Sequence, residues 1–300
     1  MATQQQQETL NYFDAFAKDW KEKAQGQKVF KVNVINQRNG YVLEVIKSRS
    51  RNSKTLDVGC GTGELVHETA KLGVQAEGVD FAPEMIKLAQ EIATKENLSN
   101  ATFNCASIFD FKMEDGSYDV ISANGFLEYI SYEQLDQFLE TAHKALAKDG
   151  SIVLGSRNRL FNVMSMNEYA SNEVANNNIG KLVNEAVQIS NMNDLSDLLK
   201  IDAVPLEKPD ATHGNTGIDV STRFQFTPVQ LAKMLDAKGF EIKGLCPVHI
   251  HGVSPAFKDG HKEAHFNISN LLSDVTNEDK ASRNKVIPFA SSFMIHATKK

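Results

Sequence analysis

The sequence predicts an α/β fold: a doubly wound, mostly parallel seven-stranded sheet with an antiparallel C-terminal strand, plus helical cap and lid insertions. Between residues 55 and 155, short apolar segments alternate with amphipathic helical segments, which is the pattern of βαβ units. A glycine-rich turn joins the first of these strands to its helix. Two more strand candidates, 241–250 and 292–298, are joined by a stretch without helical periodicity, so we expect them to pair antiparallel at the sheet edge.

The first part of the chain is expected to be helical over residues 10–47. Its aromatic residues have the near-helical spacing of core or lid packing: Tyr12, Phe13, Phe16 and Trp20. Five strands are then expected at 55–58, 74–79, 102–106, 118–122 and 151–155. The helices between them are expected at 64–72, after Pro83 and at 132–148. Pro83 suits a first helical turn, where a missing N–H costs little.

After the fifth strand the alternation breaks. The stretch 157–223 is polar and rich in Asn, with helical pieces around 184–189 and 195–199. Regularity returns with Thr227 as a helix N-cap and Gly239 as the stop of that helix. The segment 251–287 is again expected to be irregular.

These elements predict four parts of the chain. The expected parts are a helical cap (1–47), a core (48–156), an acceptor-binding or lid insertion (157–226), and the C-terminal part of the core (227–300) with a second insertion at 251–287.

Composition narrows the function classes. The 300 residues carry a net charge of −6, which argues against a general nucleic-acid binder. No apolar run approaches the roughly 20 residues that cross a bilayer. The N-terminus lacks a signal-peptide pattern, and the 3 cysteines form no CxxC pair, so we expect a cytoplasmic protein without an integral membrane segment. A monomer and a homodimer are both compatible with the sequence.

The glycine-rich turn and an acid one βα unit later form the strongest motif. The segment 56–65 reads Leu-Asp-Val-Gly-Cys-Gly-Thr-Gly-Glu-Leu and stands between a strand and a helix. Glycines at alternate positions permit a tight turn and leave no Cβ to block a ligand. Asp80 ends the second strand, where a carboxylate can accept both hydroxyls of a ribose. Together the loop and the acid predict a nucleoside site at the carboxyl ends of the strands.

The segment 56–65 resembles the signature loop of class I S-adenosylmethionine-dependent methyltransferases, which have a Rossmann-like fold. The segment 77–86 resembles their adenosine segment, and 117–120 together with 124–130 resembles their fourth-strand region. The stretch 38–42 (Arg-Asn-Gly-Tyr-Val) is similar to a segment of the ubiquinone-biosynthesis O-methyltransferases, the nearest type in motif pattern. The resemblance covers roughly residues 12–154 plus the final strands. It implies S-adenosylmethionine as cofactor and methyl transfer as the activity.

The resemblance also implies a set of cofactor-binding residues. Asp57 and the loop glycines would surround the methionine moiety, and Arg38 would face its carboxylate. Asp80 would bind the ribose, and residues 107–108 would lie near the adenine. The implied set is Arg38, Asp57, Gly59, Cys60, Gly61, Asp80, Phe81, Met85, Ser107, Ile108 and Asn124.

Two positions depart from the family pattern. Ala106 stands where the family often has an acid, so adenine contacts are expected from backbone groups. Tyr129 stands where many relatives have His, which leaves the base on this loop open. A dinucleotide-binding site fits the sequence less well. The glycine spacing is G-x-G-x-G rather than G-x-G-x-x-G, and the carboxylate of Asp57 would repel a pyrophosphate.

The acceptor site is expected where the two insertions fold over the strand ends. Arg157, Arg159 and Arg223 are the candidate acceptor-binding residues, because a guanidinium matches the oxygens of a carboxylate or phosphate. Pairing of Arg157 and Arg159 with surface acids is the plainer alternative.

Four residues are candidates for the catalytic base: His213, His249, His251 and Glu128. A histidine titrates near neutral pH and can take a hydroxyl proton. A hydrogen-bonded structural role is the commoner fate of a single histidine, and a helix-start role is comparably common for Glu128. His249 and His251 would share a strand face and could ligate a metal, but no third ligand stands close by in sequence, so we expect no metal site.

The sequence thus predicts a methyltransferase that acts on a small anionic acceptor, such as a sugar, a sugar nucleotide or a related metabolite, with O-methylation favoured. Two alternatives stay open: N-methylation of a small amine, and a regulatory protein that binds S-adenosylmethionine without turnover.

Overall fold

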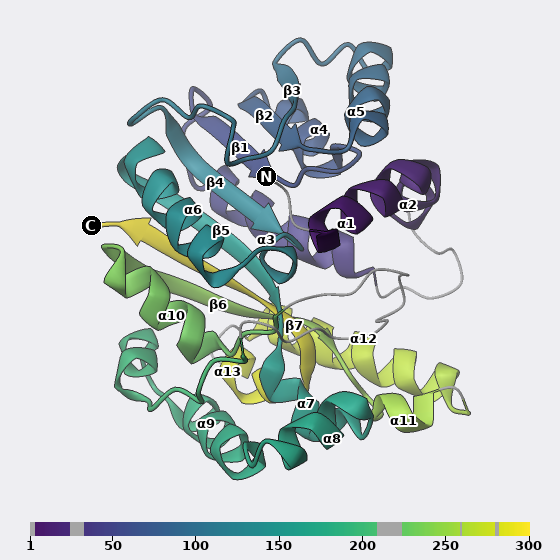
Figure 1. Cartoon of the computed structure of the whole chain (residues 1–300), viewed down its shortest axis with the longest axis vertical. Coiled ribbons are helices and arrows are strands. Elements are labelled where there is room, and N and C mark those ends of the chain that lie inside the picture. Colours follow the sequence, from purple (N-terminus) through teal and green to yellow (C-terminus); the bar gives the residue numbers. More distant parts are fainter. Residues whose placement is uncertain (1–3, 25–32, 209–223, 259, 280–281) are drawn as a thin grey trace.

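The computed structural model describes residues 4–24, 33–208, 224–258, 260–279 and 282–300. Its centre is a seven-stranded sheet with the order β3-β2-β1-β4-β5-β7-β6 (Figure 1). The strands are β1 (Lys54–Val58), β2 (Gln75–Asp80), β3 (Ala101–Cys105), β4 (Tyr118–Asn124), β5 (Leu146–Arg157), β6 (Phe240–Ile250) and β7 (Ala290–Lys299).

Strands β1 to β5 are parallel neighbours, and β7 is antiparallel to both β5 and β6. Strand β7 lies between β5 and β6. The chain therefore forms the edge strand, β6, before the strand that joins it to the rest of the sheet, β7. The reversal between β1 and β4 puts the carboxyl ends of both strands beside the same crevice. The predicted fold class is confirmed.

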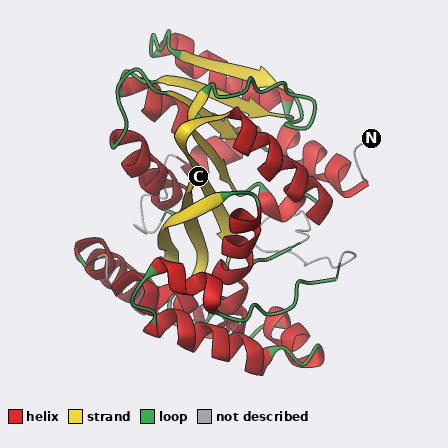
Figure 2. Ribbon diagram, turned by 90° about the vertical axis from the view of Figure 1, so that its left-hand side faces the viewer, coloured by secondary structure: helices red, strands yellow, loops and turns green. Residues whose placement is uncertain are grey.

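Helices cover both faces of the sheet, as Figure 2 shows. On one face, β1 and β4 pack against α6 and α10 in the largest buried apolar cluster, which contains Leu56, Ile121, Phe138 and Leu231. On the other face, α3 and α4 pack against the sheet. The main helices are α1 (Gln4–Ala15), α2 (Ala17–Ala24), α3 (Val34–Lys47), α4 (Glu64–Lys71), α5 (Pro83–Lys95), α6 (Tyr132–Ala145), α8 (Glu168–Ala175), α9 (Ile179–Asn191), α10 (Pro228–Ala237) and α12 (Lys262–Glu278).

Shorter helical segments link these elements: η1 (Leu127–Tyr129), η2 (Arg159–Phe161), α7 (Asn162–Ser165), η3 (Leu195–Lys200), α11 (Pro255–Lys258), α13 (Arg283–Val286) and η5 (Ile287–Phe289). Helices α7, α8, α9, α11 and α12 gather at the lower end of the molecule in Figure 1, beside the β6–β7 end of the sheet. No helix in the described part of the chain is long and apolar enough to cross a membrane.

Local sequence signals start the helices that flank the site. Ser131 and Gln134 form a reciprocal capping box at the start of α6, and Thr227 and Gln230 form another at α10. Each box satisfies two backbone donors that the first helical turn leaves open. Pro228 then occupies the first position of α10, as its sequence predicted.

Three elements differ from the sequence expectation. Helix α6 ends at Ala145, and β5 begins at Leu146, earlier than expected. The segment expected to be irregular contains α12, a helix of 17 residues. Its buried residues are polar, namely His265, Ser269 and Thr276, whereas Leu271 on the same helix is 62% exposed. Ile268, Leu271 and Val275 do have helical spacing, which the expectation overlooked, but they lie on the exposed side, so this apolar spacing does not mark the buried face.

Candidate functional site

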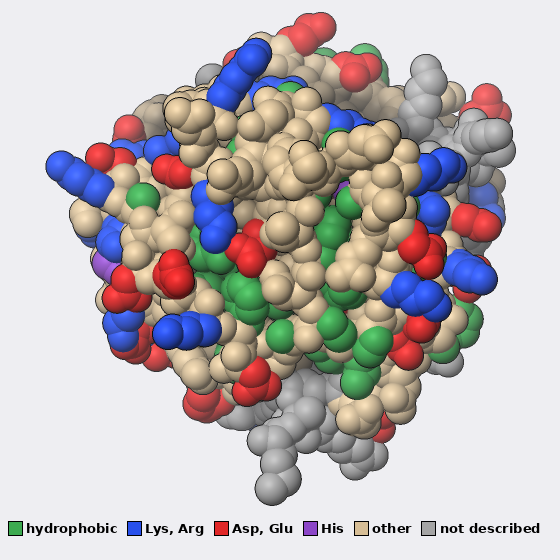
Figure 3. Space-filling view, turned by 90° about the horizontal axis from the view of Figure 1, so that it is seen from above, with side chains coloured by type: hydrophobic (Ala, Val, Ile, Leu, Met, Phe, Trp, Pro, Cys, Tyr) green, Lys and Arg blue, Asp and Glu red, His purple; other side chains and the backbone are tan. Residues whose placement is uncertain are grey.

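A cavity of about 690 Å³ opens at the carboxyl ends of the parallel strands. Its wall is formed by the ends of β1, β2 and β4, by the segment 106–110, and by residues of β5, β6 and β7. Helices α1 and α3 close one side of it. In the view from above, acidic and basic side chains are intermixed over the surface (Figure 3).

The glycine loop after β1 is held to the end of β2. The N–H of Gly61 donates to Oδ2 of Asp80 at 2.9 Å, and the N–H of Ala82 donates to Oδ1 of Asp80 at 2.9 Å. Gly61 has φ +53, a left-handed conformation that glycine adopts without strain, and a Cβ there would meet no atom within 4 Å. A Cβ on Gly63, by contrast, would lie 2.7 Å from the ring of Phe103. The loop is therefore tight on its core side and open on its cavity side.

The two acids of this region are buried. Asp57 is only 8% exposed and accepts a 2.8 Å hydrogen bond from the hydroxyl of Ser122. Burial raises the pKa of Asp57 to about 7, with a further upward contribution from the charge of Asp80. Burial also raises the pKa of Asp80. Two desolvated carboxyls side by side favour a cationic ligand group between the glycine loop and β4.

Several cavity-lining polar atoms lack partners within the described chain. Nε of Arg38, both amide atoms of Asn124 and Oε2 of Glu128 are buried and make no hydrogen bond there. Nη2 of Arg38 donates to Oγ of Ser292 at 2.9 Å, which fixes the guanidinium beside β7. Buried polar atoms without partners are rare in proteins and mark places where a ligand or water completes the bonding.

A charged pair lines the cavity where β5 and η1 meet it. Nε of Arg157, at the end of β5, donates to Oε1 of Glu128 at 3.3 Å, and the side chains are 21% and 4% exposed. Tyr129 follows Glu128 in η1, and burial raises the pKa of its phenol, so the ring stays neutral. His249, near the end of β6, also lines the cavity.

Helix α1 closes the side of the cavity opposite the strands. Leu10 and Phe13 of α1 line it, and Phe13 packs edge-on against Tyr129 with ring centroids 5.8 Å apart. Asp14 caps α5, since its Oδ1 accepts from the N–H of Glu84 at 2.9 Å. Helix α1 is thereby tied to η1 through Phe13 and to α5 through Asp14.

The family model described as a methyltransferase domain matches residues 49–204, more than half of the chain. The chain belongs to this family. It carries a class I S-adenosylmethionine-dependent methyltransferase domain, and the predicted resemblance is confirmed. S-adenosylmethionine is the methyl donor of this domain.

The curated relatives match this methyltransferase domain over part of their length. The malonyl-[acyl-carrier protein] O-methyltransferase of Bacillus cereus is 32% identical over 120 residues, which are 38% of this chain and 42% of that protein. The ubiquinone biosynthesis O-methyltransferase of Xanthomonas euvesicatoria is 28% identical over 156 residues, 51% of this chain and 62% of that protein. The chain thus spans about half the length of the curated relatives it matches.

Solved structures share the whole fold at low identity. Magnesium protoporphyrin IX methyltransferase from Synechocystis with bound S-adenosylmethionine has a TM-score of 0.57 and 13% identity, covering 100% of this chain and 99% of that one. The [4+2]-cyclase SpnF also has a TM-score of 0.57, with 15% identity, covering 99% and 97%. At this identity both similarities concern the fold alone.

The structure brings most of the predicted site residues of this methyltransferase domain together. The cavity is lined by the complete predicted cofactor set: Arg38, Asp57, Gly59, Cys60, Gly61, Asp80, Phe81, Met85, Ser107, Ile108 and Asn124. Of the acceptor and base candidates, Arg157, Glu128 and His249 line it too. His213 and Arg223 lie outside the described residues.

Two predicted site residues lie elsewhere. Among the described residues, the lining of the cavity does not include Arg159 or His251. Arg159 is 2% exposed, and its guanidinium donates to both carboxylate oxygens of Glu173, at 2.7 and 3.0 Å. The expectation that Arg159 binds the acceptor is therefore corrected: β5 ends at Arg157, and η2 then turns Arg159 into the interior of the α7–α9 group.

Sequence reasoning missed several lining residues. Ser291 and Ser292 line the cavity because β7 returns between β5 and β6. Gln134 lines it from the first turn of α6, where its side chain also completes the capping box. None of the three stands in a motif, and only the strand order brings β7 to the site.

Proposed function

We propose that this protein transfers the methyl group of S-adenosylmethionine to an oxygen atom of a small anionic acceptor. One observation carries the proposal: a single cavity runs from Asp80 and the glycine loop to the Arg157–Glu128 pair. Its volume of about 690 Å³ is in the range of small-molecule sites. Donor and acceptor would therefore occupy one cavity.

The donor end fits the cofactor in charge and shape. The carboxylate of Asp57 would take the α-ammonium group of the methionine moiety, and the guanidinium of Arg38 would take its carboxylate. Asp57 is buried, and Arg38 is partly buried, with its Nε buried and without a partner in the described chain. Asp80 would hold the ribose hydroxyls with its remaining lone pairs, while its bonds to Gly61 and Ala82 keep it in place.

The acceptor end fits an anion with an ionisable or hydroxyl oxygen. Arg157 presents a guanidinium that Glu128 contacts through Nε at 3.3 Å. Its terminal nitrogens would bind a carboxylate or phosphate oxygen of the acceptor. Oε2 of Glu128 has no hydrogen-bond partner in the described chain, so it is placed to receive a proton from an acceptor hydroxyl.

Bound S-adenosylmethionine supplies a methyl group on a sulfonium, which a nucleophile attacks in line. The protein contributes positioning, exclusion of water and a base. Arg157 orients the acceptor, Glu128 takes its hydroxyl proton as the oxygen attacks, and Phe13 and Leu10 of α1 keep water out of the donor end. The phenol of Tyr129 has a pKa raised by burial, so it stays neutral and would not serve as the base.

The test is transfer of labelled methyl from S-adenosylmethionine to a panel of carboxylic acids, sugar nucleotides, phenols and amines. We expect product with an anionic hydroxyl or carboxyl compound, and about a 10²- to 10⁴-fold lower kcat for Glu128→Gln. Arg51→Ala, an exposed arginine at the surface, is the matched control for arginine variants. Methylation of amines alone would replace the proposal by N-methylation. Donor binding without any product across the panel would favour the non-catalytic alternative.

A further inference from the structure

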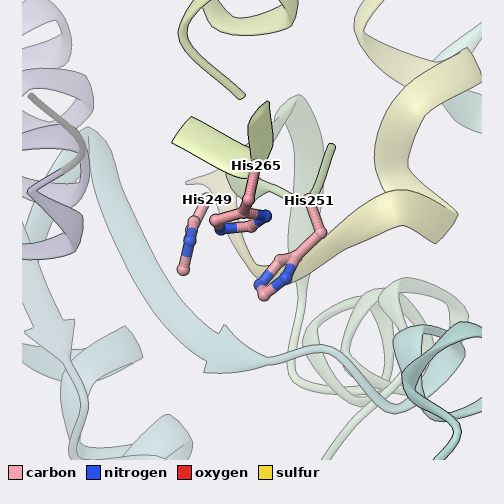
Figure 4. A group of neighbouring side chains, drawn as sticks. All are labelled: His249, His251 and His265. Atoms are coloured by element: carbon pink, nitrogen blue, oxygen red, sulfur yellow. The ribbon is translucent and has the colours of Figure 1, made fainter. Parts of the chain in front are cut away.

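Three histidines from two distant segments meet beside the acceptor end of the cavity. His249 lies near the end of β6, His251 follows that strand, and His265 lies in the first turn of α12. Their ring centroids are 4.2 Å apart for His249–His251, 4.9 Å for His251–His265 and 5.7 Å for His249–His265. Figure 4 shows the three rings side by side.

We propose that His249, His251 and His265 bind one divalent transition-metal ion, with Zn²⁺ as the first candidate. One nitrogen from each ring can be chosen so that all three lie within 4.8 Å of one another. Three nitrogens bound to Zn²⁺ at about 2.0–2.1 Å lie roughly 3.3–3.5 Å apart. Small side-chain rotations therefore close the cluster around an ion.

The backbone is shaped to bring the three rings together. His249 has φ +53, a left-handed conformation that is uncommon for a residue with a Cβ. The N–H of His249 donates to Oε1 of Gln37 on α3 at 2.7 Å. The N–H of His251 donates to the carbonyl of Phe289 at 2.8 Å, which fixes the segment after β6. Non-glycine residues in this conformation concentrate at functional sites.

A glycine lets the third histidine approach. A Cβ on Gly252 would lie 2.5 Å from Cβ of Ile268, one turn after His265 on α12. The N–H of Gly252 also donates to the hydroxyl of Ser269 at 3.3 Å. Only glycine at this position allows α12 to pack so closely on the end of β6, and this contact places the buried ring of His265 against the other two.

The donor set selects the class of ion. Three neutral imidazoles suit Zn²⁺, Cu²⁺, Ni²⁺ and Fe²⁺, whereas Mg²⁺ and Ca²⁺ prefer oxygen ligands. Sites with three protein ligands leave a further position for water or for an exchangeable ligand. Nδ1 of His249 lies 3.3 Å from the hydroxyl of Ser291. This contact orients the ring with its Nε2 turned to the ion, as the outer hydrogen bonds of metal-bound histidines commonly do.

His249 belongs to both the cluster and the cavity wall, so the ion would adjoin the acceptor end. The metal site does not depend on the proposed methyl transfer, because its ligands can be tested by metal binding alone. The sequence did not predict it, because His265 stands 14 residues beyond His251 and only the packing of α12 brings it near.

The test uses the full chain without a polyhistidine tag, stripped with a chelator and titrated with ZnCl₂ by calorimetry. We expect one Zn²⁺ per chain and at least about a 100-fold weaker affinity in His265→Gln, which keeps the side-chain size. His261→Ala is the matched control, because His261 is exposed at the start of the same helix and lies outside the cluster. It should bind Zn²⁺ as the wild type does.

Cobalt provides a second readout that needs no variant. A Co²⁺-substituted wild-type protein should show the visible absorption of a four-coordinate site, and one equivalent of Zn²⁺ should abolish it. The proposal is overturned if the wild type takes up no stoichiometric Zn²⁺, Co²⁺ or Ni²⁺, or if folded His265→Gln binds Zn²⁺ as tightly as wild type. Should His265→Gln fail to fold, His251→Ala, at a half-buried position, tests the same ligand set.

Discussion

The backbone N–H of Gly61 donates a 2.9 Å hydrogen bond to Oδ2 of Asp80. The acid that the motif assigns to the ribose is therefore also the group that fixes the glycine loop. The two ends of the motif, 19 residues apart in sequence, are one unit in the structure. A substitution of Asp80 should therefore weaken the contacts of both the ribose and the methionine moiety of the donor.

Asp80→Asn should weaken donor binding by roughly 10- to 100-fold. An amide can accept from one backbone N–H but not from both on separate oxygens, and hydrogen bonds to charged groups are worth about 1.5–3 kcal/mol. Calorimetry with S-adenosylhomocysteine measures the loss. Asp136→Asn, on the exposed side of α6, is the control and should leave the affinity unchanged. Unaltered affinity in Asp80→Asn would remove Asp80 from the donor site.

Donor affinity should fall as the pH drops below about 7. The pKa of Asp57 is raised by burial to about 7 in the free protein, so the carboxyl is increasingly neutral below that value. The α-ammonium group of the donor binds the ionised form, and the affinity then falls by up to about tenfold per pH unit. Titrations between pH 5.5 and 8.5 measure it. Asp57→Asn should bind weakly and show a flatter profile; an equally steep profile in this variant would assign the titration to another group.

Arg157→Ala should weaken acceptor binding and leave donor binding intact. The side chain lies at the end of β5, beside Glu128 and away from the glycine loop. Loss of a charge-assisted contact predicts a rise in KM for the acceptor of about 10-fold or more. Steady-state kinetics with an accepted substrate, beside calorimetry with the donor, separate the two effects. Equal acceptor affinity in Arg157→Ala and in the control Arg51→Ala would contradict this role.

Arg159→Met should destabilise the protein without changing donor affinity. The variant leaves Glu173 buried without its guanidinium partner, and breaking a buried ion pair from one side costs about 3–5 kcal/mol. Arg159→Met combined with Glu173→Gln should recover part of the loss, because the uncompensated charge is then gone. Urea unfolding gives the free energies. A single variant as stable as wild type would show that the pair contributes nothing.

Phe13→Ala should speed dissociation of the donor by about 3- to 10-fold. The ring lines the cavity and packs edge-on against Tyr129, and such aromatic pairs contribute about 0.5–1.5 kcal/mol. Phe16, 44% exposed just beyond α1, is the matched aromatic control. Stopped-flow displacement of bound donor measures the rates. Identical rates in Phe13→Ala and Phe16→Ala would mean that α1 does not retain the donor.

The core of the fold and the donor end of the cavity were predictable because short, continuous segments of the sequence determine them. Apolar segments of strand length and the turn residues between them set β1 to β5, and a glycine loop followed by an acid marks where parallel strands end. The remaining features depend on tertiary contacts. Arg157 and Arg159 stand two residues apart, and only the turn at η2 decides that one lines the cavity while the other is buried with Glu173.

The histidine cluster shows the same limit more sharply. His249 and His251 were visible as a pair from their spacing. The apolar spacing of the helix that carries His265 marks its exposed side, so it does not indicate that the polar side is buried. The position of His265 depends on the close contact between Gly252 and α12, and no sequence pattern predicts this contact.

The strand order has a consequence for how the molecule forms during synthesis. Within the described chain, β6 is hydrogen-bonded to the sheet through β7, which the ribosome makes some forty residues later. Strands β1 to β5 can pair as they emerge, so the nucleoside half of the cavity has its partners early. The half of the cavity that contains His249, Ser291 and Ser292 can form only after β7 has been made and has paired with both β5 and β6.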